Sequence, residues 1–300
     1  MFFKNCPRHD KRDINKIDKM ISMRVKDVHG GLKEYSRQHI IRSCTRAGFD
    51  DNTAEEIESR VFERAWDEIT TRKLHSIVYS EMKNRNEIFA LRFRLREAIA
   101  ELNPNYSEFE KYITKVLRID GFEAEWSPRP KPRGECIEHE IDVVAEQHGT
   151  TYMIECKHHY HHHRFTGLDI PMRQWSRLED LKRGYEHGIN NAVKADEAWV
   201  IVNTKLSDHA KRYAECKNIR MTAWKYSNED YSLDSLVERN KAYPVTILRP
   251  PQHVRTELSK KDILTVQDLI GLTDQQIEKI PVKNSVMRNI QRTAEEMVNK

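Results

Sequence analysis

The sequence predicts an α/β protein in which a mixed sheet in the middle of the chain is flanked by helical domains on both sides. Three observations lead to this prediction. Apolar residues recur at helical spacing in residues 23–102, follow both strand and helix periods in 105–226, and return to helical spacing after residue 253. A chain of 300 residues is also long enough for two to three domains. We therefore expect several cores rather than one.

The segment 23–102 is predicted to be an all-α domain that follows a basic tail over residues 1–22. Thr53 is the expected N-cap of the second helix because Glu56 follows it three residues later, and a threonine also caps the third. The predicted helices cover residues 36–47, residues 53–66, a stretch from Thr71 and residues 87–102.

Residues 105–226 are predicted to form an α/β domain in the order αβββαβαβ, with a mixed sheet. Gly121 is a good terminator for the first helix, and Pro171 suits the first turn of a later one. The predicted helices cover residues 106–118, 171–187 and 207–217, and the predicted strands include 137–146, 150–157, 198–203 and 219–224.

Two neighbouring prolines follow the C-terminal boundary of this predicted domain. Pro250 and Pro251 restrict the residues before them to extended geometry, so we predict that residues 227–252 are a linker. Residues 253–300 then return to short helices and are predicted to form a small helical domain.

The composition is strongly polar, with 33% charged residues and a mean hydropathy of −0.79. No run approaches the roughly 18 apolar residues of a membrane span, and the N-terminus lacks the apolar stretch of a signal peptide. We therefore expect a cytoplasmic protein without membrane association. The five cysteines lack CxxC spacing, which argues against a disulfide framework or a structural zinc site.

Positive charge is unevenly distributed along the chain. The net charge is only +4, but residues 1–26 contain eight Lys or Arg against three Asp, and Arg129, Lys131 and Arg133 follow one another in a proline-rich stretch. Such clusters can neutralise the phosphates of a nucleic acid. A solvated tail and a charged loop are equally compatible with the pattern.

The residues that could carry chemistry gather on a predicted β-hairpin. Alternation places Glu155 and Lys157 on one face of its second strand, and Glu140 and Asp142 on one face of its first. If the turn lies at residues 148–149, the numbers of paired residues sum to 297. This register sets Asp142 opposite Glu155, and Glu140 opposite Lys157.

Directly opposed carboxylates destabilise a sheet unless a cation lies between them. A hard cation such as Mg²⁺ or Mn²⁺ resolves the repulsion between Asp142 and Glu155, because it prefers oxygen ligands. Lys157 beside it can orient a water molecule and offset negative charge during phosphodiester hydrolysis. The alternative is an ordinary solvated hairpin face on which acidic and basic residues alternate.

The pattern Glu140-Ile-Asp142, twelve residues, Glu155-Cys-Lys157 resembles the PD-(D/E)XK core of restriction-endonuclease-like nucleases, most closely their Mrr-like and Holliday-junction-resolvase-like prokaryotic branches. An isoleucine replaces the proline that gives the motif its name. The resemblance implies an αβββαβ core in which Asp142 and Glu155 bind metal and Lys157 assists the attacking water.

The first helix of this family contributes a further carboxylate to the metal site in several branches. In this chain the resemblance implies Glu110, with Glu108 as the competing residue.

Two groups near the predicted catalytic strand have open interpretations. Five of the six residues 158–163 are histidines, which can bind a transition metal or phosphate, or simply form a polar loop. Arg164, Arg173 and Arg177 lie where the following helix can meet a DNA backbone, and the last two share a helix face. Plain solvent exposure explains the arginines as well.

Four stretches of the N-terminal domain carry a second resemblance: Val25-Lys26-Asp27, residues 30–41, Ala47-Gly48 and residues 69–79. They resemble an ATP-cone, the nucleotide-sensing domain of ribonucleotide reductases. The resemblance implies that Lys26 binds ATP or dATP, with His39 where the family usually has a lysine. A structural or dimerising cone is the alternative, and we expect a homodimer.

The C-terminal stretch 263–281 resembles the first part of a helix-hairpin-helix module, which binds DNA backbone through amides at a helix N-terminus. Val-Lys-Asn replaces the usual glycine turn, and Lys283 and Arg288 remain as candidate phosphate contacts.

Two functions from different classes follow. The first is a Mg²⁺-dependent DNA endonuclease of restriction, repair or junction type, modulated by a nucleotide. The second is a non-catalytic, nucleotide-responsive DNA-binding protein that uses a nuclease fold. Retention of Asp142, Glu155 and Lys157 together favours the enzyme.

Overall fold

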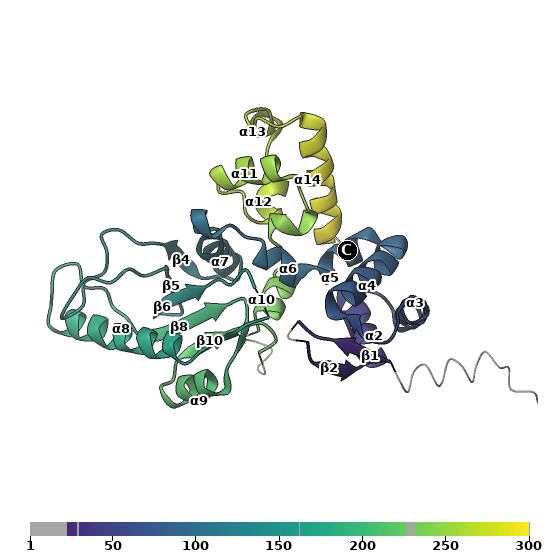
Figure 1. Cartoon of the computed structure of the whole chain (residues 1–300). Helices are drawn as coiled ribbons and strands as arrows, with labels where there is room; N and C mark the ends of the chain where they lie inside the picture. The colour runs from purple at the N-terminus through teal and green to yellow at the C-terminus, as the bar shows by residue number, and fades with distance from the viewer. Residues whose placement is uncertain (1–22, 29, 162, 227–231, 300) are drawn as a thin grey trace, which may run out of the picture. The chain divides into compact units, whose positions relative to one another are not determined.

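The computed structural model describes residues 23–28, 30–161, 163–226 and 232–299, so the predicted basic tail lies outside the described residues. The chain divides into two compact units, Met1–Phe93 and Arg94–Lys300, each with its own buried core (Figure 1). This division falls inside the single helix predicted over 87–102. We describe the two units in turn.

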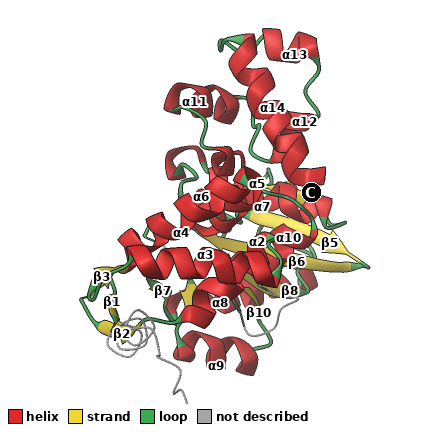
Figure 2. Cartoon of the chain, turned by 90° about the vertical axis from the view of Figure 1, so that its right-hand side faces the viewer, coloured by secondary structure: helices red, strands yellow, loops and turns green. Residues whose placement is uncertain are grey.

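Unit 1 contains a small sheet as well as helices, so the prediction of an all-α domain is wrong. Its central strand β1 pairs antiparallel with β2 and parallel with β3 (Figure 2). Strands of two or three residues are too short for a period of two to be visible in the sequence. The elements are β1 (Arg24–Lys26), β2 (Leu32–Glu34), α2 (Arg37–Ala47), α3 (Asp51–Arg64), β3 (Ile69–Thr70), α4 (Thr71–Arg85) and α5 (Glu87–Phe93).

The helix ends of unit 1 follow local capping chemistry. Ser36, the first residue of the predicted helix, is the N-cap of α2, and α3 is capped by Asp50 and not by Thr53. The Asp50 carboxylate accepts hydrogen bonds from both the amide and the hydroxyl of Thr53, at 2.9 and 2.7 Å. The helix therefore starts a turn earlier than predicted, because aspartate is itself a strong N-cap.

Unit 2 is built on a five-stranded mixed sheet in the order β10-β8-β6-β5-β4. Strands β4, β5 and β6 are antiparallel neighbours, whereas β8 pairs parallel with both β6 and β10. The predicted mixed sheet and element order are confirmed, and two short strands, β7 (Phe165–Thr166) and β9 (Lys205–Leu206), pair outside it. The sheet strands are β4 (Glu123–Trp126), β5 (Val143–Gln147), β6 (Thr150–Lys157), β8 (Glu197–Val202) and β10 (Arg220–Thr222).

Helices cover both faces of this sheet. Helix α7 (Glu108–Ile119) packs on β4, β5 and β6, while α8 (Asp169–Glu186) and α9 (Asp208–Cys216) pack together on the other side (Figure 1). The core under α8 and α9 contains Met153, Leu181 and Val200, all buried. The start of α7 and the end of β6 are thereby brought to the same region of the domain.

The β5–β6 hairpin has the predicted register. Val143 pairs with Ile154 and Gln147 with Thr150, so that 143 + 154 = 297. His148 and Gly149 form the two-residue turn with φ of 52° and 77°, which matches the positive φ values of a type I′ turn. However, β5 begins at Val143 and not at residue 137. The residues between 137 and 142 form a loop and not the first half of the predicted strand.

The predicted linker over residues 227–252 is wrong for its described part, because residues 232–252 are folded and packed. Its residues Tyr243, Val245 and Ile247 are buried, and the Ala242 carbonyl accepts a hydrogen bond of 2.8 Å from the Tyr112 hydroxyl on α7. Prolines restrict the local backbone but do not prevent a segment from packing. It contains α10 (Leu233–Arg239) and the 3₁₀ helix η3 (Val245–Leu248).

The remaining helices of unit 2 lie at its two ends. The helix predicted over 87–102 is broken at Arg94, so that α6 covers Leu95–Ala100 and is followed by η1 (Pro104–Tyr106). Near the C-terminus α12 and α13 pack against the longer α14. None of the described helices is long and apolar enough to cross a membrane. The C-terminal helices are α11 (Gln252–Lys260), α12 (Val266–Ile270), α13 (Asp274–Glu278) and α14 (Asn284–Asn299).

Candidate active site

Strand β6 carries two of the predicted catalytic residues near its C-terminal end. Glu155 and Lys157 alternate with buried Ile154 and Cys156, so they share the opposite face with Met153. The Glu155 side chain is 17% exposed and the Lys157 side chain is half-buried. Both charged groups are therefore partly withdrawn from water rather than spread over a solvated face.

Asp142 docks onto β6 from the end of the preceding loop. Its Oδ2 accepts a hydrogen bond of 2.7 Å from the Cys156 amide, which places it next to Glu155. Burial, and then the charges of Glu155 and Glu110, raise the pKa of Asp142 to about 7, against the lowering effects of that amide and of Arg177. The Asp142 carboxylate thus lies in an environment that is short of positive charge.

The third carboxylate is Glu110 in the first turn of α7. Burial and the charge of Glu155 raise the pKa of Glu110, whereas Lys157 lowers it, so this residue belongs to the same electrostatic group. Its Oε2 is buried, and no described residue donates a hydrogen bond to it. The competing Glu108 is used elsewhere, since its Oε2 accepts a hydrogen bond of 2.6 Å from the Asn103 amide.

Helix α8 supplies two contacts that the sequence did not reveal. Arg177 Nη1 lies 2.5 Å from Glu155 Oε2, and the buried Gln174 donates a 2.6 Å hydrogen bond to the Met153 carbonyl. Arg177 was expected to meet a DNA backbone, but in the structure its guanidinium neutralises a predicted metal ligand. The spacing of three puts Gln174 and Arg177 on one helix face, but it does not indicate that this face meets the catalytic strand.

Glu140 lies outside this group, so its predicted position opposite Lys157 is wrong. The side chain is 70% exposed and forms an ion pair with Lys131 at 3.1 Å, which lowers the pKa of Glu140. The reason is the early end of the ladder at Val143, beyond which the pairing rule no longer applies.

The loop that delivers Asp142 is anchored to α8. Asp180 accepts hydrogen bonds from the Cys136 amide at 2.9 Å and lies 2.7 Å from His139 Nε2. Nearby, the backbones of Gly134 and Gly184 approach so closely that a Cβ on Gly184 would lie 2.6 Å from the Gly134 carbonyl carbon. Only glycine fits at position 184, and the loop is held at several points.

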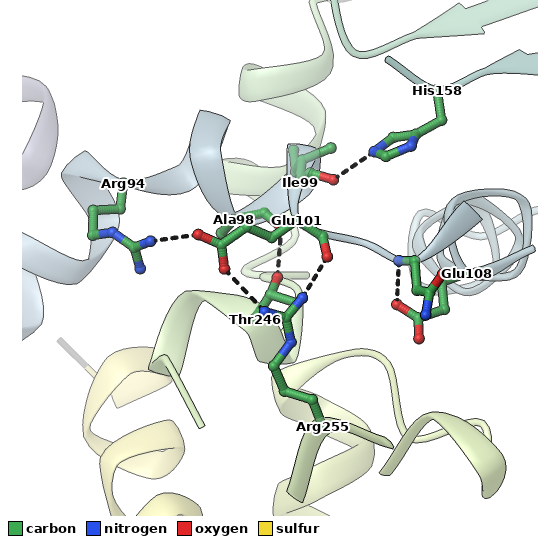
Figure 3. A network of polar contacts seen from close by, with 9 residues as sticks. Arg94, Ala98, Ile99, Glu101, Glu108, His158, Thr246 and Arg255 are labelled. Carbon is green, nitrogen blue, oxygen red and sulfur yellow. Dashed lines mark hydrogen bonds and ion pairs between the residues drawn. The ribbon is translucent and has the colours of Figure 1, made fainter. Parts of the chain in front are cut away.

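The histidine tract begins with two residues held by hydrogen bonds. His158 Nε2 lies 3.0 Å from the Ile99 carbonyl (Figure 3), and burial lowers the pKa of its ring. The His159 amide donates a hydrogen bond to Asn203 Oδ1, and Asn203 Nδ2 donates one to the His159 carbonyl, both at 2.8 Å. His162 lies outside the described residues. The start of the tract thus fixes the chain after β6.

The other predicted binding residues are not gathered at this site by any described contact. Arg173 pairs with Asp169 at 3.5 Å, and Arg288 with Asp274 at 3.2 Å. The remaining ones have exposed side chains: Lys26 on β1, His39 on α2, Arg164 before β7 and Lys283 before α14.

The donor set of the site fits a hard divalent cation. Glu110, Asp142 and Glu155 offer only carboxylate oxygens, which Mg²⁺ and Mn²⁺ favour. The unpartnered Glu110 oxygen and the raised pKa of Asp142 both indicate that a positive partner would be stabilised here. The three carboxylates are not drawn together as closely as Glu135, Cys136 and Asp180, whose donor atoms all lie within 4.8 Å. Like charges without a cation are expected to keep apart.

Comparisons with known proteins agree with this geometry. Residues 102–226 match the Mrr catalytic family, which is described as restriction endonuclease. An uncharacterized protein of Archaeoglobus fulgidus is 32% identical over 186 residues, which make up 62% of this chain and 99% of that protein.

A solved structure is also similar to this chain over most of its own length. The crystal structure of a protein of unknown function, AF1548, superposes with a TM-score of 0.53 at 31% identity, covering 65% of this chain and 98% of that one. The chain therefore belongs to the same family as the Archaeoglobus fulgidus protein, and its residues 102–226 form a restriction-endonuclease-like domain of the Mrr type.

Proposed function

We propose that this chain is a metal-dependent DNA endonuclease that hydrolyses phosphodiester bonds in its Mrr-type domain. The observation that carries the proposal is the partly buried group of Glu110, Asp142 and Glu155 beside Lys157. Three carboxylates without a cation repel one another in a site of low dielectric. Such a group of carboxylates lowers the stability of the fold, so its presence is better explained by metal binding and phosphodiester hydrolysis than by a structural role.

Each residue of the group has a distinct role in the proposal. Glu110, Asp142 and Glu155 would hold Mg²⁺ or Mn²⁺, which when bound polarises the scissile phosphate and supplies an activated water. Lys157 orients the attacking water and offsets the negative charge that develops on the phosphate. Arg177 holds Glu155, so metal binding by Glu155 competes with an existing ion pair.

Removing one carboxylate tests the metal site directly. We expect Asp142→Asn and Glu155→Gln to weaken Mg²⁺ or Mn²⁺ binding by at least about tenfold, because each removes a charged ligand. Cleavage should be lost with the metal while the fold persists. Isothermal titration calorimetry with each metal measures the affinity, and circular dichroism checks the fold.

The matched control is Glu146→Gln, which removes an exposed carboxylate from the same hairpin. It should bind metal as the wild type does. Identical titration curves for wild type, Asp142→Asn and Glu155→Gln would rule out this metal site.

For unit 1 we propose a nucleotide-sensing role of ATP-cone type. Its support is the resemblance of its sequence, together with Lys26 and His39, whose side chains are exposed on β1 and α2. We expect weak ATP or dATP binding that depends on Lys26, because its ammonium can pair with a phosphate. Nucleotide binding is also expected to change the assembly of a homodimer.

Equilibrium dialysis and sedimentation velocity with and without dATP check both expectations. Lys26→Ala should lose most of the retained nucleotide, whereas Arg60→Ala, which removes an exposed cation from α3, should not. No retention of ATP or dATP at millimolar concentration would leave unit 1 with a structural role only.

For the C-terminal helices we propose binding to DNA backbone of helix-hairpin-helix type. Lys283 lies directly before α14, whose N-terminus is favourable for a phosphate, and its side chain is exposed. Arg288 follows on the same helix but is paired with Asp274. Lys283 is thus the stronger candidate of the two.

A further inference from the structure

A basic cavity lies between the end of α6 and the start of α11 in unit 2. Its volume is about 600 Å³, and its lining includes Arg94, Arg249, Arg255, Glu101 and Tyr160. Three guanidinium groups face one carboxylate, so the lining carries net positive charge. A cavity of this size and sign is suited to an anionic ligand larger than a simple ion.

The single carboxylate of the cavity is already fully engaged. Glu101 Oε1 lies 2.8 Å from Arg94 Nη2 and Oε2 lies 3.4 Å from Arg255 Nη1, while Arg255 also donates to the Glu101 carbonyl (Figure 3). Arg94 Nη1 is buried, and no described residue accepts a hydrogen bond from it. Because this nitrogen is covered, Arg94 adds its positive charge to the cavity, whereas the partly exposed Arg255 and the exposed Arg249 can contact a phosphate directly.

The start of α11 adds to the attraction for an anion. This nine-residue helix begins after Pro251, and no side chain caps it. Its first residue, Gln252, lines the cavity, and the exposed Arg249 precedes it by three positions. Free amides and the positive end of the helix dipole therefore add to the field of the arginines.

Two chain segments connect the cavity to the active site. Tyr160 follows the catalytic candidate Lys157 by three residues, a span of about 10 Å at most. On the other side, the chain from Glu101 leads through Glu108, which accepts a hydrogen bond from the Asn103 amide, to the metal-ligand candidate Glu110. One DNA strand advances about 3.4 Å per nucleotide, so the cavity is within a few nucleotides of the cleavage point.

The bond between His158 and the Ile99 carbonyl fixes this arrangement. It ties the chain after β6 to α6, directly before the cavity residue Glu101 (Figure 3). This hydrogen bond therefore links the chain after the active-site strand to the helix that precedes the cavity.

We propose that this cavity binds one nucleotide of the substrate strand close to the cleaved bond, with its phosphate on the arginines and its base or sugar against Tyr160. The Tyr160 side chain is 68% exposed, so its ring is accessible for stacking beside the edge contact that it makes with the His161 ring. This assignment rests on the proposed nuclease function for the identity of the strand. It adds a contact outside the metal site that orients the DNA.

The test uses two variants at exposed positions, so that folding is preserved. Arg249→Asn removes one charge at a residue with φ of 54°, a left-handed conformation that asparagine tolerates, and Tyr160→Ala removes the ring. Arg212→Gln removes an exposed charge from α9, which does not line the cavity, and serves as the control. Binding is measured by fluorescence anisotropy of the full chain with a labelled single-stranded DNA of about 16 nucleotides, roughly the length of one binding site. EDTA prevents cleavage during the measurement.

We expect Arg249→Asn to weaken strand binding at least tenfold and to reduce the salt dependence of log K by about 0.7, the value for one phosphate contact on a single strand. Tyr160→Ala should weaken binding at least about fivefold with an unchanged salt slope. Arg212→Gln should bind as the wild type does.

Equal strand affinity for all four proteins would overturn the proposal, whether or not the wild type cleaves DNA with Mg²⁺ in a parallel assay. The metal-free binding experiment therefore fails separately from the nuclease function. Labelled ATP provides the second arm. If Arg249→Asn weakens ATP binding but leaves strand binding intact, the cavity is an effector site and the strand assignment is wrong.

Discussion

Lys157→Ala is expected to cut DNA at least about a hundredfold more slowly than the wild type while binding it within a small factor of wild-type affinity. Its ammonium acts on the attacking water and on charge that develops at the phosphate, interactions that exist mainly in the transition state. Removing one preorganised electrostatic group of this kind typically costs about 10²–10³ in rate. A single phosphate contact contributes far less to the binding of a long substrate.

The measurement pairs single-turnover cleavage of supercoiled, linear and branched DNA with gel shifts in EDTA. Lys205→Ala, which removes an exposed lysine from β9, is the control and should leave both readouts unchanged. If Lys157→Ala loses binding in proportion to cleavage, the residue is a phosphate anchor. If the wild type cuts no form with Mg²⁺ or Mn²⁺, the non-catalytic DNA-binding function applies.

Asp142→Asn is expected to stabilise the metal-free protein at pH 8 by about 2–4 kcal/mol, the opposite of its effect on metal binding. The pKa of this carboxyl rises from 3.8 when unfolded to about 7 in the fold, so the folded state binds the proton more tightly than the unfolded chain. The contribution of this carboxyl to the free energy of unfolding is therefore fully present below about pH 4, and it is lost as the pH rises through 7. Asparagine keeps an oxygen for the Cys156 amide but carries no charge.

Urea unfolding in EDTA at several values between pH 5 and pH 8 measures this effect. The advantage of Asp142→Asn should grow with pH up to about 7 and stay constant above it. With saturating Mg²⁺ the order should reverse, because only the wild type gains binding energy from the ion. A stability difference that does not change between pH 5 and pH 8 would show that burial does not raise the pKa of this carboxyl.

The elements that could be predicted from the sequence are those specified by local chemistry. The register of β5–β6 follows from alternation and from a turn at His148 and Gly149, and both depend on neighbouring residues only. Glu155 and Lys157 share a face of β6 for the same reason, whereas Asp142 lies before the ladder and is held by the Cys156 amide. Helix α8 was recognisable from its apolar spacing, although it begins two residues earlier than predicted.

The parts that could not be predicted depend on contacts between distant segments. The resemblance implies Glu110 rather than Glu108, but the physical reason, the use of Glu108 at Asn103, is a contact that only the folded chain shows. Arg177 reaches Glu155 from α8, a pairing over 22 residues that no local pattern indicates. Tyr243 is buried and its carbonyl accepts a hydrogen bond from the Val266 amide, so the two prolines do not mark a linker at this point.

The loop over residues 129–142 is anchored to α8, so local unfolding of this helix is expected to affect the active site as well. The same helix fixes the loop through Asp180 and Gly184 and holds Glu155 through Arg177. A local opening that detaches α8 would release Asp142 and Glu155 together. Although the loop has no helix or strand of its own, it belongs to the same cooperative unit as α8. Asp142 and Glu155 are therefore expected to be lost together, whereas Glu110 is held separately by α7.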